Sequence, residues 1–236
     1  MINFIENSLF FGAALSLAGY EVGLLLKKKF KMALFNPLLI AILCVMGMLQ
    51  LMQVDYKTYN AGGQYISYLL TPATVCLAVP LYRQLTLLRK NLKAVVIGIV
   101  SGVLASLVSV LILARLFRLC KLMNLSHEMY VTMLPKSITT AIGMGVSEEL
   151  GGLVTITVAV IIITGVLGNV IAEAVLKVAK IEEPIAKGLA LGTSAHAIGT
   201  SKAMELGPVE GAMSSLAIAV AGLLTVIAAS VFAGFM

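Results

Sequence analysis

The sequence predicts an all-α polytopic membrane protein with about six full spans and two re-entrant, broken-helix hairpins in an inverted repeat. Hydrophobic residues make up 60% of the 236 residues and charged residues only 12%, whereas a soluble domain is about 25% charged. The apolar residues also gather in long runs, and a helix that crosses a bilayer needs about 20 of them. These values exclude an ordinary soluble globule and a disordered chain.

Eight apolar runs divide the chain. Five of them are continuous and are typical of ordinary spans, and Asn36–Pro37 at the start of the second predicts a capped helix. The third, fifth and seventh runs are interrupted by Pro, Gly or clustered polar residues. The eight runs cover residues 8–26, 34–52, 64–82, 94–117, 129–147, 151–176, 184–204 and 211–235.

The loop charges indicate an orientation, because basic residues favour the cytoplasmic side of a membrane. Four lysines lie between residues 27 and 31, and four more basic residues lie between 83 and 93. Placing both stretches in the cytoplasm puts the N-terminus outside. Arg115, Arg118 and Lys121 then lie on the outer side, against the general rule.

The second half of the chain contains an internal repeat. Residues 141–151 and 197–207 share six identities in eleven positions at an offset of 56, where about one is expected by chance at average composition. Each copy precedes a full apolar run. We therefore expect two duplicated units, about 127–176 and 184–235, each made of a re-entrant hairpin and a spanning helix.

The single span between the two hairpins predicts how they are related. If each hairpin enters and leaves on one face, the two hairpins enter from opposite faces, and their tips meet near the midplane. Paired interrupted segments in equivalent positions indicate a transporter's substrate site. The uneven distribution of breaks predicts a scaffold-like region, 1–124, and a mobile transport region, 125–236, as in an elevator-like transporter.

The first hairpin carries a lysine beside a helix break. Pro135 ends a helix, which places the residues after it at a helix N-terminus, where free N–H groups and the helix dipole attract an anion. Lys136 adds a full positive charge, which is costly in hydrocarbon unless it faces water, a partner or a ligand. Ser137, Thr139 and Thr140 add hydroxyl donors. The alternative is that Lys136 reaches the membrane interface.

The second hairpin repeats this chemistry. Its small residues permit an unwound backbone, its hydroxyls can donate hydrogen bonds, and its imidazole titrates close to neutral pH. The alternative is a packed histidine at a tight contact between helices. The candidate binding residues in this segment are Thr193, Ser194, His196, Gly199, Thr200 and Ser201. We expect a small carboxylate between these residues and the stretch 136–140.

The remaining interruption lies in the third run. Pro72 and Pro80 predict a kinked or broken helix, and a pathway role and a purely structural kink both stay open. The possible pathway residues are Thr71, Pro72, Thr74 and, from the second hairpin, Lys202.

Enzymatic functions are not indicated. The sequence has no HExxH, no GxSxG and no nucleotide-phosphate loop, and Ser194 and His196 have no evident Asp to complete a triad. The three cysteines are far apart, as expected for small packing residues. We expect no enzymatic activity, no cofactor and no metal ion. We also expect no nucleic-acid partner, because the excess of basic residues serves to orient the helices.

These motifs resemble the LrgB/CidB family of bacterial inner-membrane proteins, which includes the C-terminal half of the plastidial glycolate/glycerate translocator. One difference is Ala141, where the family often has Pro. The stretches that carry the resemblance are residues 36–39, 72–82, 134–140, 188–200 and 210–212.

The resemblance implies a secondary transporter of small monocarboxylates such as glycolate, glycerate, pyruvate or lactate in the inner (plasma) membrane. It also implies a small LrgA/CidA-type membrane subunit, in a homodimer or hetero-oligomer. The family's other description, holin/antiholin-like control of murein hydrolase export and cell lysis, is the alternative function. The paired broken segments favour a carrier, because an oligomeric pore does not need them.

Overall fold

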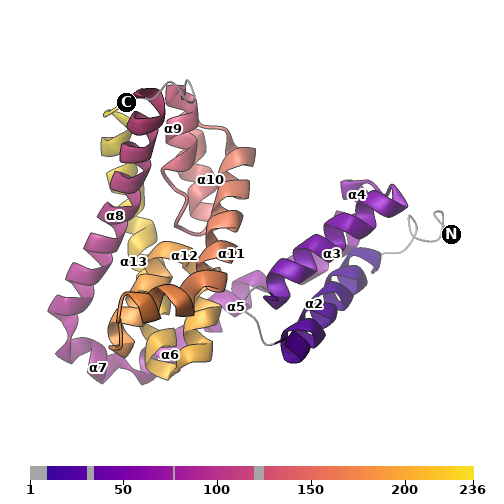
Figure 1. Cartoon of the computed structure of the whole chain (residues 1–236), viewed down its shortest axis with the longest axis horizontal. Coiled ribbons are helices and arrows are strands. Elements are labelled where there is room, and N and C mark those ends of the chain that lie inside the picture. The colour runs from indigo at the N-terminus through magenta and orange to yellow at the C-terminus, as the bar shows by residue number, and fades with distance from the viewer. Residues whose placement is uncertain (1–9, 31–34, 77, 120–124) are drawn as a thin grey trace. The chain divides into compact units, whose positions relative to one another are not determined.

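A computed structural model describes residues 10–30, 35–76, 78–119 and 125–236. All regular secondary structure in these ranges is helical (Figure 1), which confirms the predicted all-α class. The chain divides into two compact units, Met1–Cys76 and Leu77–Met236, and each is described by itself below.

The first unit contains four described helices, in which α2 packs against α3 and α4. The α3 helix begins as predicted, with Pro37 at its first position and the Asn36 side chain accepting hydrogen bonds from the N–H groups of Leu38 and Leu39. Gly23 lets α2 approach the start of α3 closely, since a methyl group at Gly23 would lie 2.6 Å from the Pro37 carbonyl oxygen. The helices are α2 (Phe11–Phe30), α3 (Pro37–Met52), α4 (Tyr56–Ser67) and α5 (Leu70–Cys76).

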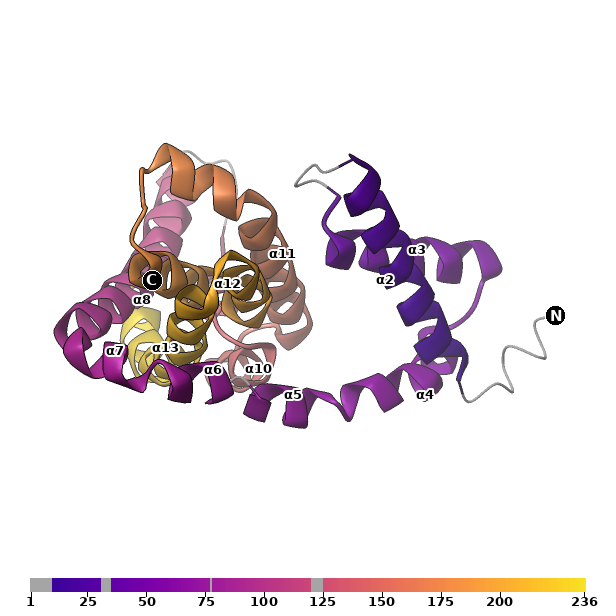
Figure 2. The same cartoon turned by 90° about the horizontal axis from the view of Figure 1, so that it is seen from below.

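The second unit is built around α12, which lies beside both α11 and α13 (Figure 2). The α8 helix packs against α12 and α13. The helices of this unit are α6 (Ala78–Arg83), α7 (Leu85–Lys90), α8 (Leu92–Leu119), α9 (His127–Met133), α10 (Thr140–Glu149), α11 (Val154–Val178), α12 (Pro184–Leu206) and α13 (Pro208–Ala233).

The α8 helix has one buried and one exposed apolar face. Its buried residues recur every three or four positions, as one face of a helix requires: Val95, Ile99, Val103, Leu107, Val110 and Ala114. Ile97, Leu104 and Ile112 on other faces are exposed. A soluble helix would carry polar residues there, so α8 has the surface of a helix in lipid.

Among the described residues of the second unit, three helices are long and apolar enough to cross a bilayer: α8 (Leu92–Leu119), α11 (Val154–Val178) and α13 (Pro208–Ala233). The α3 helix is apolar but shorter, with 16 residues. The protein is therefore a multi-pass membrane protein in architecture. The total of about six full spans stays a prediction.

Both interruptions predicted in the second half are present. In the first, seven-residue α9 and ten-residue α10 are separated by the loop 134–139, and neither is long enough to span a bilayer. In the second, α12 is broken at Ala195 (φ −130°, ψ 17°) and His196 (φ 43°, ψ −136°). The first half of α12 ends at this break and the second half begins after it.

The helix boundaries of the two predicted repeat units correspond at the offset of 56 residues. The change from loop to helix at 139–140 corresponds to the break at 195–196, and α11 corresponds closely to α13. In Figure 1, α11 and α13 run in opposite directions. The inverted repeat, and the membrane face from which each hairpin enters, both stay predictions.

The α11 helix supports both hairpins through two polar side chains. The Thr157 hydroxyl donates to the Thr132 carbonyl of α9 (3.0 Å), and its oxygen lies 2.7 Å from Ser147 Oγ of α10, within hydrogen-bond distance. Three turns later, Asn169 Nδ2 donates to the Ile198 carbonyl (2.7 Å) and to Ser201 Oγ (3.2 Å) in the second half of α12. The span between the two hairpins therefore also bonds to each of them.

The division into compact units falls after Cys76, so α8 belongs to the same unit as both hairpins. The predicted regions, 1–124 and 125–236, rest on the distribution of the helix breaks rather than on packing, and they stay a prediction.

Two glycines of α11 make room for the break in α12. A methyl group at Gly165 would lie 2.6 Å from His196 Cε1, and one at Gly168 would lie 2.6 Å from the Ala195 Cβ. Real Cβ atoms do not approach other atoms this closely, so a larger residue at either position would force the break away from α11.

We expect Gly165→Ala to destabilise the protein by about 1–3 kcal/mol, the usual cost of overpacking a core, in thermal unfolding measured in detergent. His196→Ala should relieve much of that cost in the double variant, because it removes the ring. Gly145→Ala is the matched control, since Gly145 lies in α10 with open space around it. Equal effects at Gly145 and Gly165 would contradict this account.

Candidate functional site

The loop between α9 and α10 is buried and tightly turned. Its N–H groups bond three residues back, from Lys136 to the Met133 carbonyl (3.2 Å) and from Ile138 to the Pro135 carbonyl (3.3 Å). The helix begins only at Thr140, with Thr139 as its N-cap. Thr139 and Thr140 therefore lie at a helix N-terminus, as expected, but tight turns separate this N-terminus from Pro135. Lys136 and Ser137 lie in the loop before the helix.

The Lys136 ammonium is bound by two neutral hydroxyls. It donates to Ser106 Oγ of α8 (3.3 Å) and to Ser137 Oγ (3.1 Å), and Ser106 Oγ donates to Ser137 Oγ (3.0 Å). In the part of the chain that the structure describes, no carboxylate forms a salt bridge with Lys136. An ammonium has three N–H donors, so one is left for a ligand or water.

A cavity of about 440 Å³ brings the two predicted segments together. Lys136 comes from the first break and Ser194 from the turn just before the second, and Thr164 of α11 is the third polar residue of the wall. The rest of the wall is apolar and comes from α11, α12 and the loop between them: Leu167, Gly168, Ile171, Ala172, Val175, Leu176, Ile181, Ala190 and Leu191.

The α8 helix contacts both breaks, which sequence reasoning did not predict. Ser106 bonds to the first break. One turn earlier, Gly102 accommodates Thr193, since a methyl group at Gly102 would lie 2.6 Å from Thr193 Oγ1. The available signal was the spacing of Gly98, Gly102 and Ser106, because small residues four apart mark close helix contacts in membranes.

His196 points into the protein, towards α11. Its Nε2 lies 3.0 Å from the Ile161 carbonyl oxygen, and only 3% of the residue is exposed. A carbonyl only accepts, so Nε2 carries the proton of this hydrogen bond. His196 does not line the cavity, and this contact fits the packing alternative that the sequence left open.

The other predicted residues of the second hairpin mainly hold the broken helix in place. Thr193 Oγ1 donates to the Leu189 carbonyl (2.8 Å) and faces α8. Thr200 Oγ1 donates to the His196 carbonyl (3.0 Å) and lies 2.7 Å from Ser214 Oγ of α13. These two side chains do not line the cavity with Lys136.

The remaining contacts of the second half of α12 have the same character. Gly199 packs against the first half, since a methyl group there would lie 2.5 Å from the Leu191 carbonyl oxygen. Ser201 donates to the Ile198 carbonyl (2.7 Å). Lys202 forms ion pairs with Glu173 of α11 and with Glu205 (3.0 Å).

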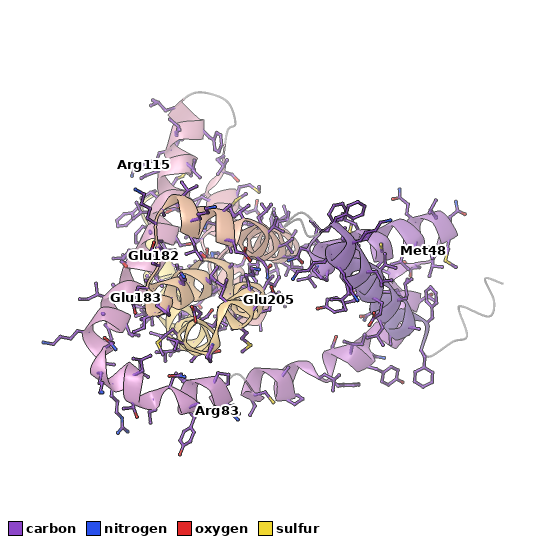
Figure 3. The ribbon with its side chains drawn as sticks, turned by 60° about the horizontal axis from the view of Figure 1, so that its bottom comes forward. Met48, Arg83, Arg115, Glu182, Glu183 and Glu205 are labelled. Atoms are coloured by element: carbon purple, nitrogen blue, oxygen red, sulfur yellow. The ribbon has the colours of Figure 1, made fainter. Side chains whose placement is uncertain are left out.

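The acidic side chains in and next to α12 lie towards the ends of the helix. Glu182 and Glu183 directly precede the helix, and Glu205 is near its last turn; Figure 3 labels all three. All three are exposed. Lys136, which has hydroxyl partners and faces a cavity, is in a different environment.

Two of the predicted residues of the first hairpin are not brought to the cavity. Thr139 and Thr140 are half-buried at the start of α10 and do not line it. Thr71 and Pro72 are exposed on α5, in the first unit, and the side chain of Thr74 lies outside what the structure describes. A pathway role for these three residues stays a prediction.

Comparison with known proteins agrees with the architecture. Residues 16–235 match the LrgB-like family. Proteins named antiholin-like protein LrgB from Bacillus mycoides, Bacillus cereus and Bacillus anthracis are each 38% identical to this chain over 228 residues, which is 96% of this chain and 96% of each relative. No solved structure matches the chain significantly. The family match covers nearly the whole sequence, so the chain belongs to the LrgB-like family.

Proposed function

We propose that this protein is an antiholin-like membrane component that binds and carries small monocarboxylates at the Lys136 cavity. The names of its relatives support the antiholin-like part better than the carrier part, because they name no transported substrate. The carrier part rests on the geometry of the second unit.

The environment of Lys136 is the observation that carries the proposal. An ammonium in a membrane segment is costly without compensation, and the two hydroxyls that bind it are neutral. A carboxylate would supply the missing negative charge through a charge-assisted hydrogen bond. Ser194 lines the same cavity, with its hydroxyl donating to the Ala190 carbonyl (2.6 Å), so a small anion there would lie beside both broken segments.

The broken segments favour carrying over pore formation. Backbone interruptions at membrane depth are tolerated where protein or a water-filled cavity surrounds them, and transporters bind substrates at such interruptions. A pore made by assembling whole spans needs no such site. An effect on cell lysis would then follow indirectly, from an altered flux of weak acids across the membrane.

The proposal assigns a wider moving part than residues 125–236. Ser106 bonds to Lys136 and Ser137, so α8 would move together with the hairpins. The inner-membrane location, the external N-terminus, the LrgA/CidA-type subunit, the oligomer and the absence of enzymatic activity belong to this proposal as well.

We expect Lys136→Ala to weaken substrate binding about ten- to hundredfold, because a hydrogen bond to a charged group contributes about 1.5–3 kcal/mol. Lys136→Arg should restore only part of it, since a planar guanidinium differs in shape from a compact ammonium. The measurement is uptake of labelled pyruvate and glycolate into proteoliposomes, and Lys177→Ala, at an exposed lysine of α11, is the control. Unchanged uptake by well-folded Lys136→Ala protein would place the site elsewhere.

Ser106→Ala should weaken the same uptake about fivefold, corresponding to about 1 kcal/mol for one neutral hydrogen bond. Because Ser106 acts through the lysine, the substitution should have little further effect in protein that already carries Lys136→Ala. Ser109→Ala is the matched control, since Ser109 bonds to the α8 backbone. Additive effects of the two substitutions would argue that Ser106 acts independently of Lys136.

The two parts of the proposal can be separated in cells. Expression of the protein should slow autolysis of a bacterial culture that lacks its own relative, and Lys136→Ala should abolish this effect if it depends on carboxylate flux. The measurement is the decline in optical density, with membrane levels of both proteins matched by immunoblot. Equal protection by both proteins would keep the antiholin-like part and refute its link to transport.

A further inference from the structure

A second cavity lies where α11 ends and α12 begins. Its volume is about 380 Å³, and Lys136 does not line it. Both ends of the second hairpin reach it, since Lys187 in the first turn of α12 and Leu206 at the end of α12 are in its wall. It shares only the apolar residues Leu176 and Ile181 with the cavity at Lys136, so the polar groups of the two cavities are different.

The wall of this second cavity carries unbalanced positive charge. Its basic residues are Lys177, Lys180 and Lys187, and among the described residues none of the three forms a salt bridge. Its acidic residues are Glu173 and Glu182, and Glu173 already pairs with Lys202. In the described wall, Glu182 is therefore the one carboxylate left to face three ammonium groups, and a bound anion would gain net attraction.

Lys180 occupies a position where glycine is usual. It follows the C-cap of α11 and has a φ of 53°. Its N–H bonds to the Lys177 carbonyl (3.1 Å), and the N–H of Ile181 bonds to the Leu176 carbonyl (2.9 Å). This pair of bonds is the Schellman motif, whose left-handed residue is usually glycine because a Cβ is unfavourable there. The turn itself therefore does not need the lysine side chain.

Lys187 also lies where local electrostatics disfavour it. The first turn of α12 is the positive end of the helix dipole, which repels a cation and attracts an anion. Two of the three lysines thus occupy positions that their own backbone does not favour, and both line the same cavity. An anion bound between them would compensate both ammonium groups.

Next to this cavity, α11 exposes an apolar face. Val178, its last residue, is 85% exposed, and Val175 and Ile171 are exposed one and two turns before it. Exposed aliphatic residues on a helix of spanning length are expected to contact lipid tails. Lysines at the end of such a helix extend to the level of the lipid headgroups.

The predicted orientation places this end of α11 in the cytoplasm. The basic stretch 83–93 lies on that side, α8 leaves it, and α11 returns to it if the first hairpin enters and leaves on one face. Anionic lipids give the cytoplasmic leaflet a negative surface potential, which attracts basic side chains close to a membrane helix. The three lysines would then lie at the level of headgroups of opposite charge.

We propose that this cavity binds the phosphate of an anionic phospholipid, whose acyl chains lie along the exposed face of α11. Lys180 and Lys187 bind the phosphate as compact cations. A zwitterionic lipid fits less well, because its own ammonium group would meet the same lysines. The inference goes beyond the proposed function and does not depend on it, since Lys136 has no part in this site.

The test is native mass spectrometry of the full chain in detergent, titrated with phosphatidylglycerol or with phosphatidylethanolamine of the same acyl chains. Each basic residue near an anionic lipid contributes about 1 kcal/mol, or about fivefold, so two lysines should favour phosphatidylglycerol by about 25-fold. Glycerol phosphate, which has a phosphate without acyl chains, should displace little of the bound lipid at equal concentration.

Lys180→Gly separates binding from folding. It removes the ammonium and supplies the residue that the turn prefers, so it should weaken phosphatidylglycerol binding about fivefold without lowering the thermal stability. Lys180→Arg should keep most of the binding. Gln53→Gly is the matched control, because Gln53 also has a φ of 53° at the end of a helix but lies in the first unit. It should leave lipid binding unchanged.

The double variant Lys180→Gly, Lys187→Ala should lose the preference for phosphatidylglycerol over phosphatidylethanolamine. Equal binding of the two lipids by the unmodified protein, or an unchanged preference in the double variant, would overturn the proposal. If glycerol phosphate displaces the lipid at equal concentration, the site takes a soluble phosphate and the assignment to a lipid is refuted. If Lys180→Gly lowers the thermal stability and leaves lipid binding unchanged, Lys180 only stabilises the end of α11, and the proposal also fails.

Discussion

A helix can be broken at membrane depth only where the protein replaces the backbone hydrogen bonds that the break removes, and the second unit is organised around this constraint. The α11 helix meets it for both hairpins. Thr157 bonds to the first hairpin, and Asn169 bonds to the second. The backbone carbonyl of Ile161 accepts a hydrogen bond from the His196 ring. The position of the cavity follows from this arrangement, because both breaks must lie against the same helix.

The breaks themselves could be predicted from the sequence, but their atomic form could not. Clustered Gly, Pro and hydroxyl residues identify the two interrupted segments correctly. Within the second segment, however, glycine is the residue expected at an unusual backbone conformation, and the positive φ falls on His196 instead. Gly192 and Gly199 have another use: a methyl group at either would lie 2.5 Å from a backbone carbonyl oxygen, of Ser214 and Leu191 respectively. Local pattern does not distinguish glycine needed for packing from glycine needed for dihedral freedom.

The polar partners of the breaks were harder to predict, because they lie in runs that look like ordinary spans. Thr157 and Asn169 are polar residues in the run 151–176, and Ser106 is a serine in the run 94–117. A threonine or serine in such a run can satisfy itself by bonding to its own helix backbone, as Ser109 does. Only tertiary contact reveals that Ser106 and Thr157 bond across helices. Asn169 gave the strongest signal, since an amide in a membrane helix seeks a partner on a neighbouring helix.

The two lysines of the broken segments have different environments, and this difference supports the proposal that Lys136 binds an anion whereas Lys202 has a structural role. Lys202 pairs with two carboxylates, so its charge is balanced within the protein and it fastens the second half of α12 to α11. Lys136 is held by hydroxyls that orient the ammonium without neutralising it. A carboxylate can therefore bind at Lys136 without first displacing an internal carboxylate. Because the bound anion would neutralise that charge, the occupied segment would be less costly to move through a bilayer than the empty one. In the proposed function, this difference favours movement of the acid-bound segment across the membrane.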